Sequence, residues 1–194
     1  MPESIRRPRD AQATKALLLK AATAEFAEYG LAGARIDRIA ERAGANKRLI
    51  YVYFGDKDKL FDAVLQRQID AVAENVPLTP DDLAAFAGAR FDYVLANPET
   101  ARLNAWRTFE RATPSEAERE SYEIKVQAIA EAQRAGKVNG TIPAIDLFAM
   151  VLRISESWLS GAPGLKALAE DTPARLREHR EAMVEAVRSF TAPR

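Results

Sequence analysis

Residues 36–54, IDRIAERAGANKRLIYVYF, decide the fold of this chain. Two short apolar patterns with helical spacing lie on either side of the segment Gly44-Ala45-Asn46. The first pattern consists of Ile36, Ile39, Ala40 and Ala43, and the second consists of Ile50 and Phe54. A short helix, a tight turn that contains glycine and a second short helix predict a helix-turn-helix motif.

The segment before this motif completes a small core. Leu18, Ala22 and Phe26 follow helical spacing within residues 11–29. We therefore expect three helices to close around one apolar centre.

The start of the third predicted helix carries residues suited to nucleic acid. Asn46 is a good N-cap, Lys47 and Arg48 follow it in the first turn, and Tyr51 lies one turn later. A recognition helix contacts base edges with its N-terminal residues, and Lys and Arg bind guanine or phosphate. The partial positive charge of a helix N-terminus favours phosphate as well.

Charge is uneven along the chain although its total is zero. The 194 residues contain 28 Lys or Arg and 28 Asp or Glu, so nucleic-acid binding has to rest on local charge. Residues 1–60 hold 12 Lys or Arg against 8 Asp or Glu, a net +4, and the remainder carries −4. This asymmetry predicts a basic N-terminal unit and an acidic C-terminal unit.

The composition excludes several classes of site. The chain has no cysteine, which excludes disulfides, thiol nucleophiles and cysteine-ligated metals. His179 is the one histidine, and because its neighbours in the sequence are charged, we predict that it lies on a helix surface. We therefore expect the protein to have no metal site, no cofactor and no catalytic residue. No apolar run is long enough for a membrane span, and the polar, basic start MPESIRRPRD is unlike a secretory signal, so we expect a cytoplasmic protein.

Helix signals recur along the whole chain, whereas strand signals do not. Capping side chains precede a proline at Thr79, Asn97, Thr113 and Thr172. Glycines stand at expected helix ends at positions 30, 44, 136 and 161. We predict an all-α fold of about nine helices, at 11–29, 36–43, 47–53, 57–74, 80–96, 98–111, 115–135, 143–159 and 173–190.

An ordered set of residues in the first third of the chain matches a known family. The set is Leu18-Leu19-x-Ala21-Ala22, Phe26, Gly30, Ile39-Ala40, Ala43-Gly44, Lys47, Ile50-Tyr51, Tyr53-Phe54, Lys57 and Leu60-Phe61. In this order and at these spacings, the residues resemble the DNA-binding domain of TetR-family transcriptional regulators.

The resemblance implies a division of the chain and a mode of action. Residues 1–55 would form the helix-turn-helix DNA-binding domain, with residues 1–9 as a flexible basic arm, and residues 56–194 the ligand-binding and dimerisation domain. The arm would follow the phosphates or the minor groove, or form a tail that only raises local charge. The family implies a homodimer formed through the last two helices, which represses from a palindromic operator in double-stranded DNA and is released by a small-molecule effector.

The DNA-binding residues expected on this basis are Arg35, Asn46, Lys47, Arg48, Tyr51, Tyr53 and Lys57, the last matching the family's phosphate-contacting lysine. Three departures from the family pattern stand out. Ala34-Arg35 replaces a threonine pair, so a hydroxyl cap is lost and Arg35 becomes a candidate phosphate contact. Arg48 replaces a glycine in the recognition helix, and Glu25 stands where an apolar residue is common, which leaves its contacts open.

Large apolar residues in the C-terminal part form either the core of a helical domain or the lining of an effector cavity. An apolar lining suits a lipophilic or aromatic effector. The candidate ligand-binding residues are Phe86, Tyr93, Leu103, Trp106, Phe109, Tyr122, Ile129, Leu152 and Trp158. Polar residues able to orient a ligand are Arg102, Asn104, Arg107, Glu110 and Ser155.

The last two predicted helices carry apolar stripes that form either an internal core or a dimer interface. The stripe residues are Ile145, Phe148, Ala149, Leu152, Leu159, Met183, Val187 and Phe190. Three functions remain open on the residues alone: an effector-responsive DNA-binding regulator, a helical enzyme that uses carboxylates, and an adaptor that binds only protein. The resemblance favours the regulator, which is not an enzyme, with the helix at 57–74 as the lever between its domains.

Overall fold

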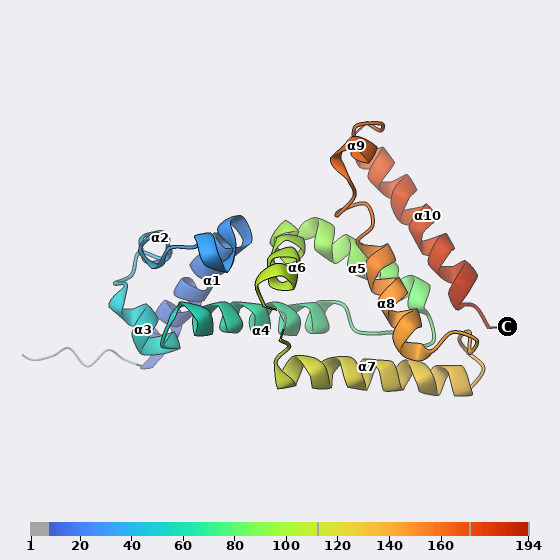
Figure 1. The fold of residues 1–194 in the computed structure, drawn as a ribbon, viewed down its shortest axis with the longest axis horizontal. Coiled ribbons are helices and arrows are strands. Elements are labelled where there is room, and N and C mark those ends of the chain that lie inside the picture. The colour runs from blue at the N-terminus through green and yellow to red at the C-terminus, as the bar shows by residue number, and fades with distance from the viewer. Residues whose placement is uncertain (1–7, 112, 171, 194) are drawn as a thin grey trace, which may run out of the picture. The chain divides into compact units, whose positions relative to one another are not determined.

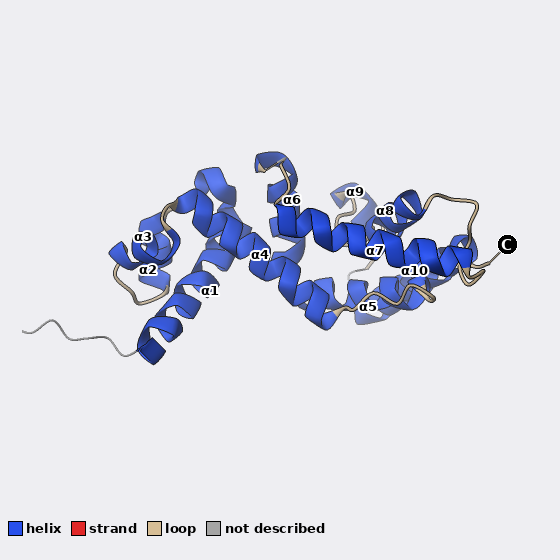
Figure 2. Ribbon diagram, turned by 90° about the horizontal axis from the view of Figure 1, so that it is seen from below, coloured by secondary structure: helices blue, strands red, loops and turns tan. Residues whose placement is uncertain are grey.

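All regular elements in the described part of the chain are helices. The computed structural model describes residues 8–111, 113–170 and 172–193, and Figure 2 shows helices joined by loops throughout these ranges. The predicted all-α fold is confirmed, with ten helices in the described ranges instead of about nine. The additional element is α9 (Pro163–Lys166), a single turn that begins at a proline. No described helix is both long and apolar enough to cross a membrane.

The other helices follow the predicted order (Figure 1). They are α1 (Pro8–Gly33), α2 (Ile36–Arg42), α3 (Arg48–Phe54), α4 (Lys57–Asn75), α5 (Leu83–Ala96), α6 (Pro98–Glu110), α7 (Glu116–Arg134), α8 (Ala144–Ser155) and α10 (Pro173–Thr191). Residues 1–7 of the predicted basic arm lie outside the described residues, and the backbone of Pro8 and Arg9 begins α1.

Helix starts depend on which side chain reaches a free backbone N–H. Thr172 caps α10 as predicted, because its hydroxyl accepts a hydrogen bond from the Arg175 N–H at 3.2 Å. α5 begins three residues later than predicted, because Asp82 is the cap that accepts from the Ala85 N–H. Ser115 caps α7 in the same way. At the other end, α8 stops at Ser155 and the chain continues in turns, so the predicted end at residue 159 is wrong.

The chain packs into two compact units. The first comprises residues up to 70 together with 102–113, and the second comprises 71–101 and 114–194. α4 and α6 each contribute to both units, since their residues are divided at positions 70/71 and 101/102. The functional boundary at residues 55/56, expected from the family, stays a prediction.

The first unit has a core built from the stripes seen in the sequence. Leu18, Phe26, Ile39 and Ile50 are fully buried there. Phe26 packs edge-on against Phe61 of α4, with ring centroids 4.9 Å apart. α4 therefore closes the three-helix core predicted from residues 11–54, as apolar burial favours.

The second unit is centred on α5, which packs against both α8 and α10. Seven residues of α5 are buried: Leu83, Ala84, Phe86, Ala87, Gly88, Phe91 and Val94. Gly88 permits the close approach of α10, because a Cβ there would lie 2.9 Å from Arg180 Nη2 and 3.1 Å from Val184 Cγ2. α7 completes the unit by packing on α8.

Gly30 interrupts α1 with a backbone that L side chains rarely adopt. Its φ is 68°, and a Cβ at this position would lie 2.7 Å from the Trp106 ring and 2.9 Å from Glu110 Oε2. Trp106 donates its indole N–H to the Ala27 carbonyl at 3.3 Å, so the ring lies against the C-terminal part of α1. The glycine thus serves both the turn and the packing of α6.

We expect Gly30→Ala to destabilise the protein more than Gly44→Ala does. Both glycines have positive φ, but a Cβ at Gly44 would meet nothing within 4 Å. Gly44→Ala should cost about 1 kcal/mol from backbone strain, and Gly30→Ala about 1–3 kcal/mol more from overpacking against Trp106. Urea unfolding of the two variants measures this difference. Equal losses would contradict the role given to Trp106.

Candidate DNA-binding site

The turn between α2 and α3 is closed by two backbone hydrogen bonds. The Ala45 N–H donates to the Ala40 carbonyl, and the Gly44 N–H donates to the Glu41 carbonyl, both at 3.0 Å. With Gly44 at φ 60°, this is the Schellman arrangement that ends a helix and reverses the chain at once. The tight turn predicted from the sequence is therefore present and leads directly into α3.

The Asn46 side chain bonds to the start of α3, but Asn46 is not the N-cap residue that the sequence predicts. Its Oδ1 accepts a hydrogen bond from the Arg48 N–H at 2.9 Å. α3 begins at Arg48, one residue later than predicted, and its N-cap residue is Lys47, whose side chain makes no capping bond. Ile50 is fully buried and anchors α3 in the core of the first unit. The other side of α3 is open, with Tyr51 52 % and Val52 66 % exposed.

The predicted DNA-binding residues gather at the starts of α2, α3 and α4. Arg35, Asn46, Lys47, Arg48 and Tyr51 are exposed, as a contact surface requires. Tyr53 and Lys57 are partly buried. The Tyr53 ring packs at right angles to Phe54 and against the core, so much of it is structural.

Two polar contacts link these helix starts. Lys47 Nζ lies 3.1 Å from Asp37 Oδ1, which joins the start of α3 to the first turn of α2. Lys57 Nζ donates to the Ala34 carbonyl at 3.3 Å, which joins the start of α4 to the residue before Arg35. The structure thus brings Arg35, Lys47 and Lys57 to one end of the motif.

The residue that sequence reasoning left open, Glu25, is the centre of this end. Its side chain is fully buried in α1, and Oε1 accepts from the Arg35 N–H at 2.9 Å and from Arg38 Nε at 2.7 Å. Arg35 is the N-cap residue of α2, and its own N–H has no partner within the helix. Glu25 therefore satisfies a backbone donor at the start of α2 from a different helix, and its charge is favourable at a helix N-terminus.

Arg38 completes the contact from α2. Its Nη2 lies 2.6 Å from Glu25 Oε1 and donates to the Gly33 carbonyl at 2.9 Å. The guanidinium carbon also lies 4.1 Å from the centre of the Tyr29 ring, a cation–π geometry. Arg38 is thus held by a carboxylate, a carbonyl and an aromatic face at the same time.

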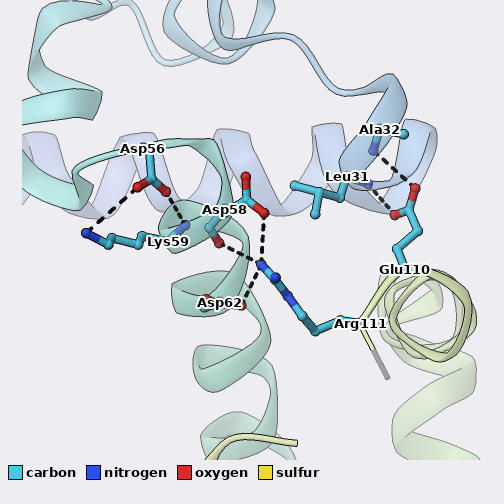
Figure 3. A network of polar contacts seen from close by, with 8 residues as sticks. All are labelled: Leu31, Ala32, Asp56, Asp58, Lys59, Asp62, Glu110 and Arg111. Atoms are coloured by element: carbon cyan, nitrogen blue, oxygen red, sulfur yellow. Dashed lines mark hydrogen bonds and ion pairs between the residues drawn. The ribbon is translucent and has the colours of Figure 1, made fainter. Parts of the chain in front are cut away.

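The C-terminal end of α6 binds the same region of the first unit (Figure 3). The Glu110 carboxylate accepts from the Leu31 N–H at 2.5 Å and from the Ala32 N–H at 3.1 Å. The next residue, Arg111, pairs with Asp58 and Asp62 of α4 at 3.3 Å and 3.1 Å. α6 is therefore tied to both α1 and α4.

Comparisons with known proteins agree with this geometry. Residues 18–64 match the family model described as bacterial regulatory proteins, tetR family, and residues 82–189 match the one described as tetracyclin repressor-like, C-terminal domain. The HTH-type transcriptional repressor SCO4008 of Streptomyces coelicolor is 44 % identical over 164 residues, which cover 82 % of this chain and 85 % of that protein. The chain belongs to the TetR family.

Two further proteins are similar to this TetR-family chain, one over about half of its length and one over nearly all of it. The HTH-type transcriptional repressor NicS of Pseudomonas putida is 35 % identical over 109 residues, or 51 % of this chain and 50 % of that protein. The solved structure of SCO4942 from Streptomyces coelicolor, described as a transcriptional regulator, superimposes with a TM-score of 0.83 at 33 % identity, covering 93 % of this chain and 99 % of that one. The protein is accordingly a DNA-binding transcriptional regulator and not an enzyme, as the sequence predicted.

The predicted ligand-binding residues of the regulator are divided between the two units. Phe86 and Ile129 are buried in the core of the second unit, and Tyr93, Leu152 and Trp158 pack partly buried against it. Tyr122 is partly exposed and contacts Phe148, with ring centroids 6.2 Å apart.

Three of the predicted ligand-binding residues lie on the part of α6 that belongs to the first unit. Leu103 is fully buried in the core of that unit, Trp106 covers Gly30, and Phe109 is 83 % exposed. The structure therefore does not bring these three together with the other six within one unit. Helical spacing alone could not reveal this, because α6 contributes to both units.

His179 is partly buried and packs against aromatic rings, whereas the sequence predicted a helix-surface residue among charged neighbours. Its ring packs between Trp158 and Phe91, with centroid distances of 5.1 Å and 5.8 Å. Burial lowers the pKa of His179, and the positive charge of Arg175 lowers it further. The described residues contain no group of three or more His, Asp or Glu placed to hold a metal ion.

We expect removal of the Glu25 carboxylate to destabilise the first unit strongly. Glu25→Ala removes the acceptor of the Arg35 N–H and one of the two acceptors of the Arg38 guanidinium, which should cost about 1–3 kcal/mol in urea unfolding. Glu28→Ala is the matched control on the same helix, because Glu28 forms an exposed pair with Arg42 at 3.7 Å, and such pairs contribute about 0–1 kcal/mol. Similar losses for the two variants would show that Glu25 has no special role.

Proposed function

We propose that this TetR-family regulator is a homodimeric repressor that binds a palindromic operator and is released by a small lipophilic or aromatic effector. The observation that carries the proposal is the set of exposed polar and basic side chains at the starts of α2 and α3. Helix N-termini together with Arg and Lys suit phosphate and guanine. Binding to chromosomal DNA would also mean a cytoplasmic protein, as the sequence predicts.

The proposed DNA contacts are Arg35, Asn46, Lys47, Arg48, Tyr51, Tyr53 and Lys57. Arg48 and Tyr51 would meet base edges from the first turns of α3, and Arg35 and Lys57 would bind phosphate at the start of α2. A dimer would present two copies of α3 about 34–36 Å apart, so that they enter successive major grooves of a palindromic site.

The dimer is proposed to form through α8 and α10. Three residues of the predicted interface stripe, Phe148, Met183 and Val187, are buried in the core of the second unit and are not available to a partner. Ile145, in contrast, is 63 % exposed on α8, and Ala149 follows it one turn later, also exposed. These exposed residues support α8 as part of the interface.

The effector is proposed to bind in the second unit, where Phe86, Tyr93, Tyr122, Leu152 and Trp158 supply apolar and aromatic surface. An effector releases DNA only if it binds more tightly to a state in which the two copies of α3 are wrongly spaced. α4 is the proposed lever, since its residues belong to both units. α6 is proposed as a second lever, because Glu110 at its end binds Leu31 and Ala32, and the next residue, Arg111, pairs with Asp58.

We expect Lys47→Ala and Arg48→Ala to weaken operator binding without unfolding the protein. The operator is first obtained by selecting bound genomic fragments with the purified protein, and gel-shift titrations over a salt series follow. Each variant should bind about tenfold more weakly, and loss of a phosphate contact should reduce the salt slope by about 1. Arg134→Ala is the control, because Arg134 lies exposed in the second unit. Unchanged affinity of both variants would overturn the assignment of α3.

We expect Ile145→Glu to convert the dimer to a monomer, because it places a charge in the proposed apolar interface. Ile124→Glu is the matched control, since Ile124 is similarly exposed but lies on α7. Sedimentation velocity at micromolar protein should give a dimer for the wild type and for Ile124→Glu, and a monomer for Ile145→Glu. A dimer that persists in Ile145→Glu would remove α8 from the interface.

A further inference from the structure

α5, α7 and α8 bring aromatic rings and two cations together in the second unit. Phe148 of α8 lies between Phe86 of α5 and Tyr122 of α7, with centroid distances of 6.0 Å and 6.2 Å. Arg90 follows Phe86 by one turn of α5, and Lys125 follows Tyr122 by one turn of α7. Apolar surface and positive charge thus adjoin in one cluster.

Arg90 is only partly satisfied in this cluster. One terminal nitrogen of its guanidinium forms an ion pair with Glu156, and both side chains are nearly buried. The Arg90 Nε is buried as well and has no hydrogen-bond partner among the described residues. A buried donor without an acceptor costs free energy, and a suitable acceptor would remove that cost.

Lys125 is half-buried and has only neutral partners. Its Nζ donates to Ser121 Oγ at 3.0 Å and lies 5.6 Å from the centre of the Tyr122 ring. Burial lowers the pKa of Lys125, and the positive charge of Arg90 lowers it further. Among the described residues, no carboxylate forms an ion pair with the Lys125 ammonium, whose contacts are with Ser121 and Tyr122. The cluster therefore holds two cations, Lys125 and Arg90, and one carboxylate, Glu156.

We propose that the effector carries a negatively charged group, which is bound by Lys125 together with Arg90. A carboxylate or sulfonate oxygen would accept from the Lys125 ammonium and the Arg90 Nε, and an aromatic body would lie against the exposed Tyr122 ring, which Phe148 supports from the core. This inference rests on the proposed function, because it names the chemical class of the effector for the same unit. The excess positive charge favours an anion over a neutral or cationic molecule of the same size.

Two fluorescent dyes that differ only in one charged group test the inference. 8-Anilino-1-naphthalenesulfonate is an anion, and N-phenyl-1-naphthylamine is its neutral parent. In fluorescence titrations of the full-length protein, we expect the anion to bind about tenfold more tightly, since hydrogen bonds to charged groups contribute this much.

Substitutions then assign the preference to the cluster. Lys125→Met should weaken binding of the sulfonate dye about tenfold and leave the neutral dye unchanged, whereas Lys125→Arg should retain the preference. Lys137→Met is the matched control, because Lys137 is an exposed lysine that pairs with Asp81 at 2.6 Å. Thermal melting checks that the variants are folded, and Lys125→Gln replaces Lys125→Met if the latter is not.

Three results would overturn the inference. Equal or tighter binding of the neutral dye by the wild-type protein is the first, and it would leave the proposed aromatic effector intact. Sulfonate binding that is unchanged in Lys125→Met and Lys125→Gln is the second. Binding of neither dye is the third, and the operator assays with Lys47→Ala and Arg48→Ala would still decide DNA binding independently.

Discussion

The start of α2 is held by a carboxylate that is completely buried in the first unit. Glu25 accepts hydrogen bonds from the Arg35 backbone and from the Arg38 side chain, so one charged group from α1 engages two residues of the helix-turn-helix motif. Apolar contacts are not directional, whereas charge-assisted hydrogen bonds are. Ile39 and Ile50 hold α2 and α3 against the core, and Glu25 determines where along that core α2 begins.

The same short segment receives contacts from two further helices. Within residues 31–35, Glu110 of α6 binds the backbone N–H groups of Leu31 and Ala32, and Lys57 of α4 binds the Ala34 carbonyl. A shift of α4 or α6 would therefore act on the residues that position α2. Both helices also contribute residues to the second unit. In the function proposed above, in which an effector binds the second unit, α4 and α6 would therefore act on the DNA-binding motif through this segment.

The sequence was sufficient for features with a local physical cause. The glycine turn at Gly44 and the Thr172 cap could both be predicted, because each depends on residues within one or two turns. Contacts between residues far apart in the chain could not be predicted from the sequence. Ala34-Arg35 and Glu25 were both recognised as departures from the family pattern, but only the structure shows that Glu25 binds the backbone N–H of Arg35. Likewise, no periodicity in α6 could assign Leu103 and Trp106 to the first unit.

Positive and negative charges also balance locally in the proposed DNA-binding face, as they do over the whole chain. Lys47, which the family pattern assigns to DNA, is paired with Asp37 at 3.1 Å, and both side chains are well exposed. The carboxylate reduces the attraction of this face for any phosphate backbone, because non-specific affinity comes from uncompensated cations. If α3 enters the groove as proposed, base contacts would then contribute a larger share of the discrimination between sites. A face of mixed charge in the proposed site would thus favour selective binding over general attraction to DNA.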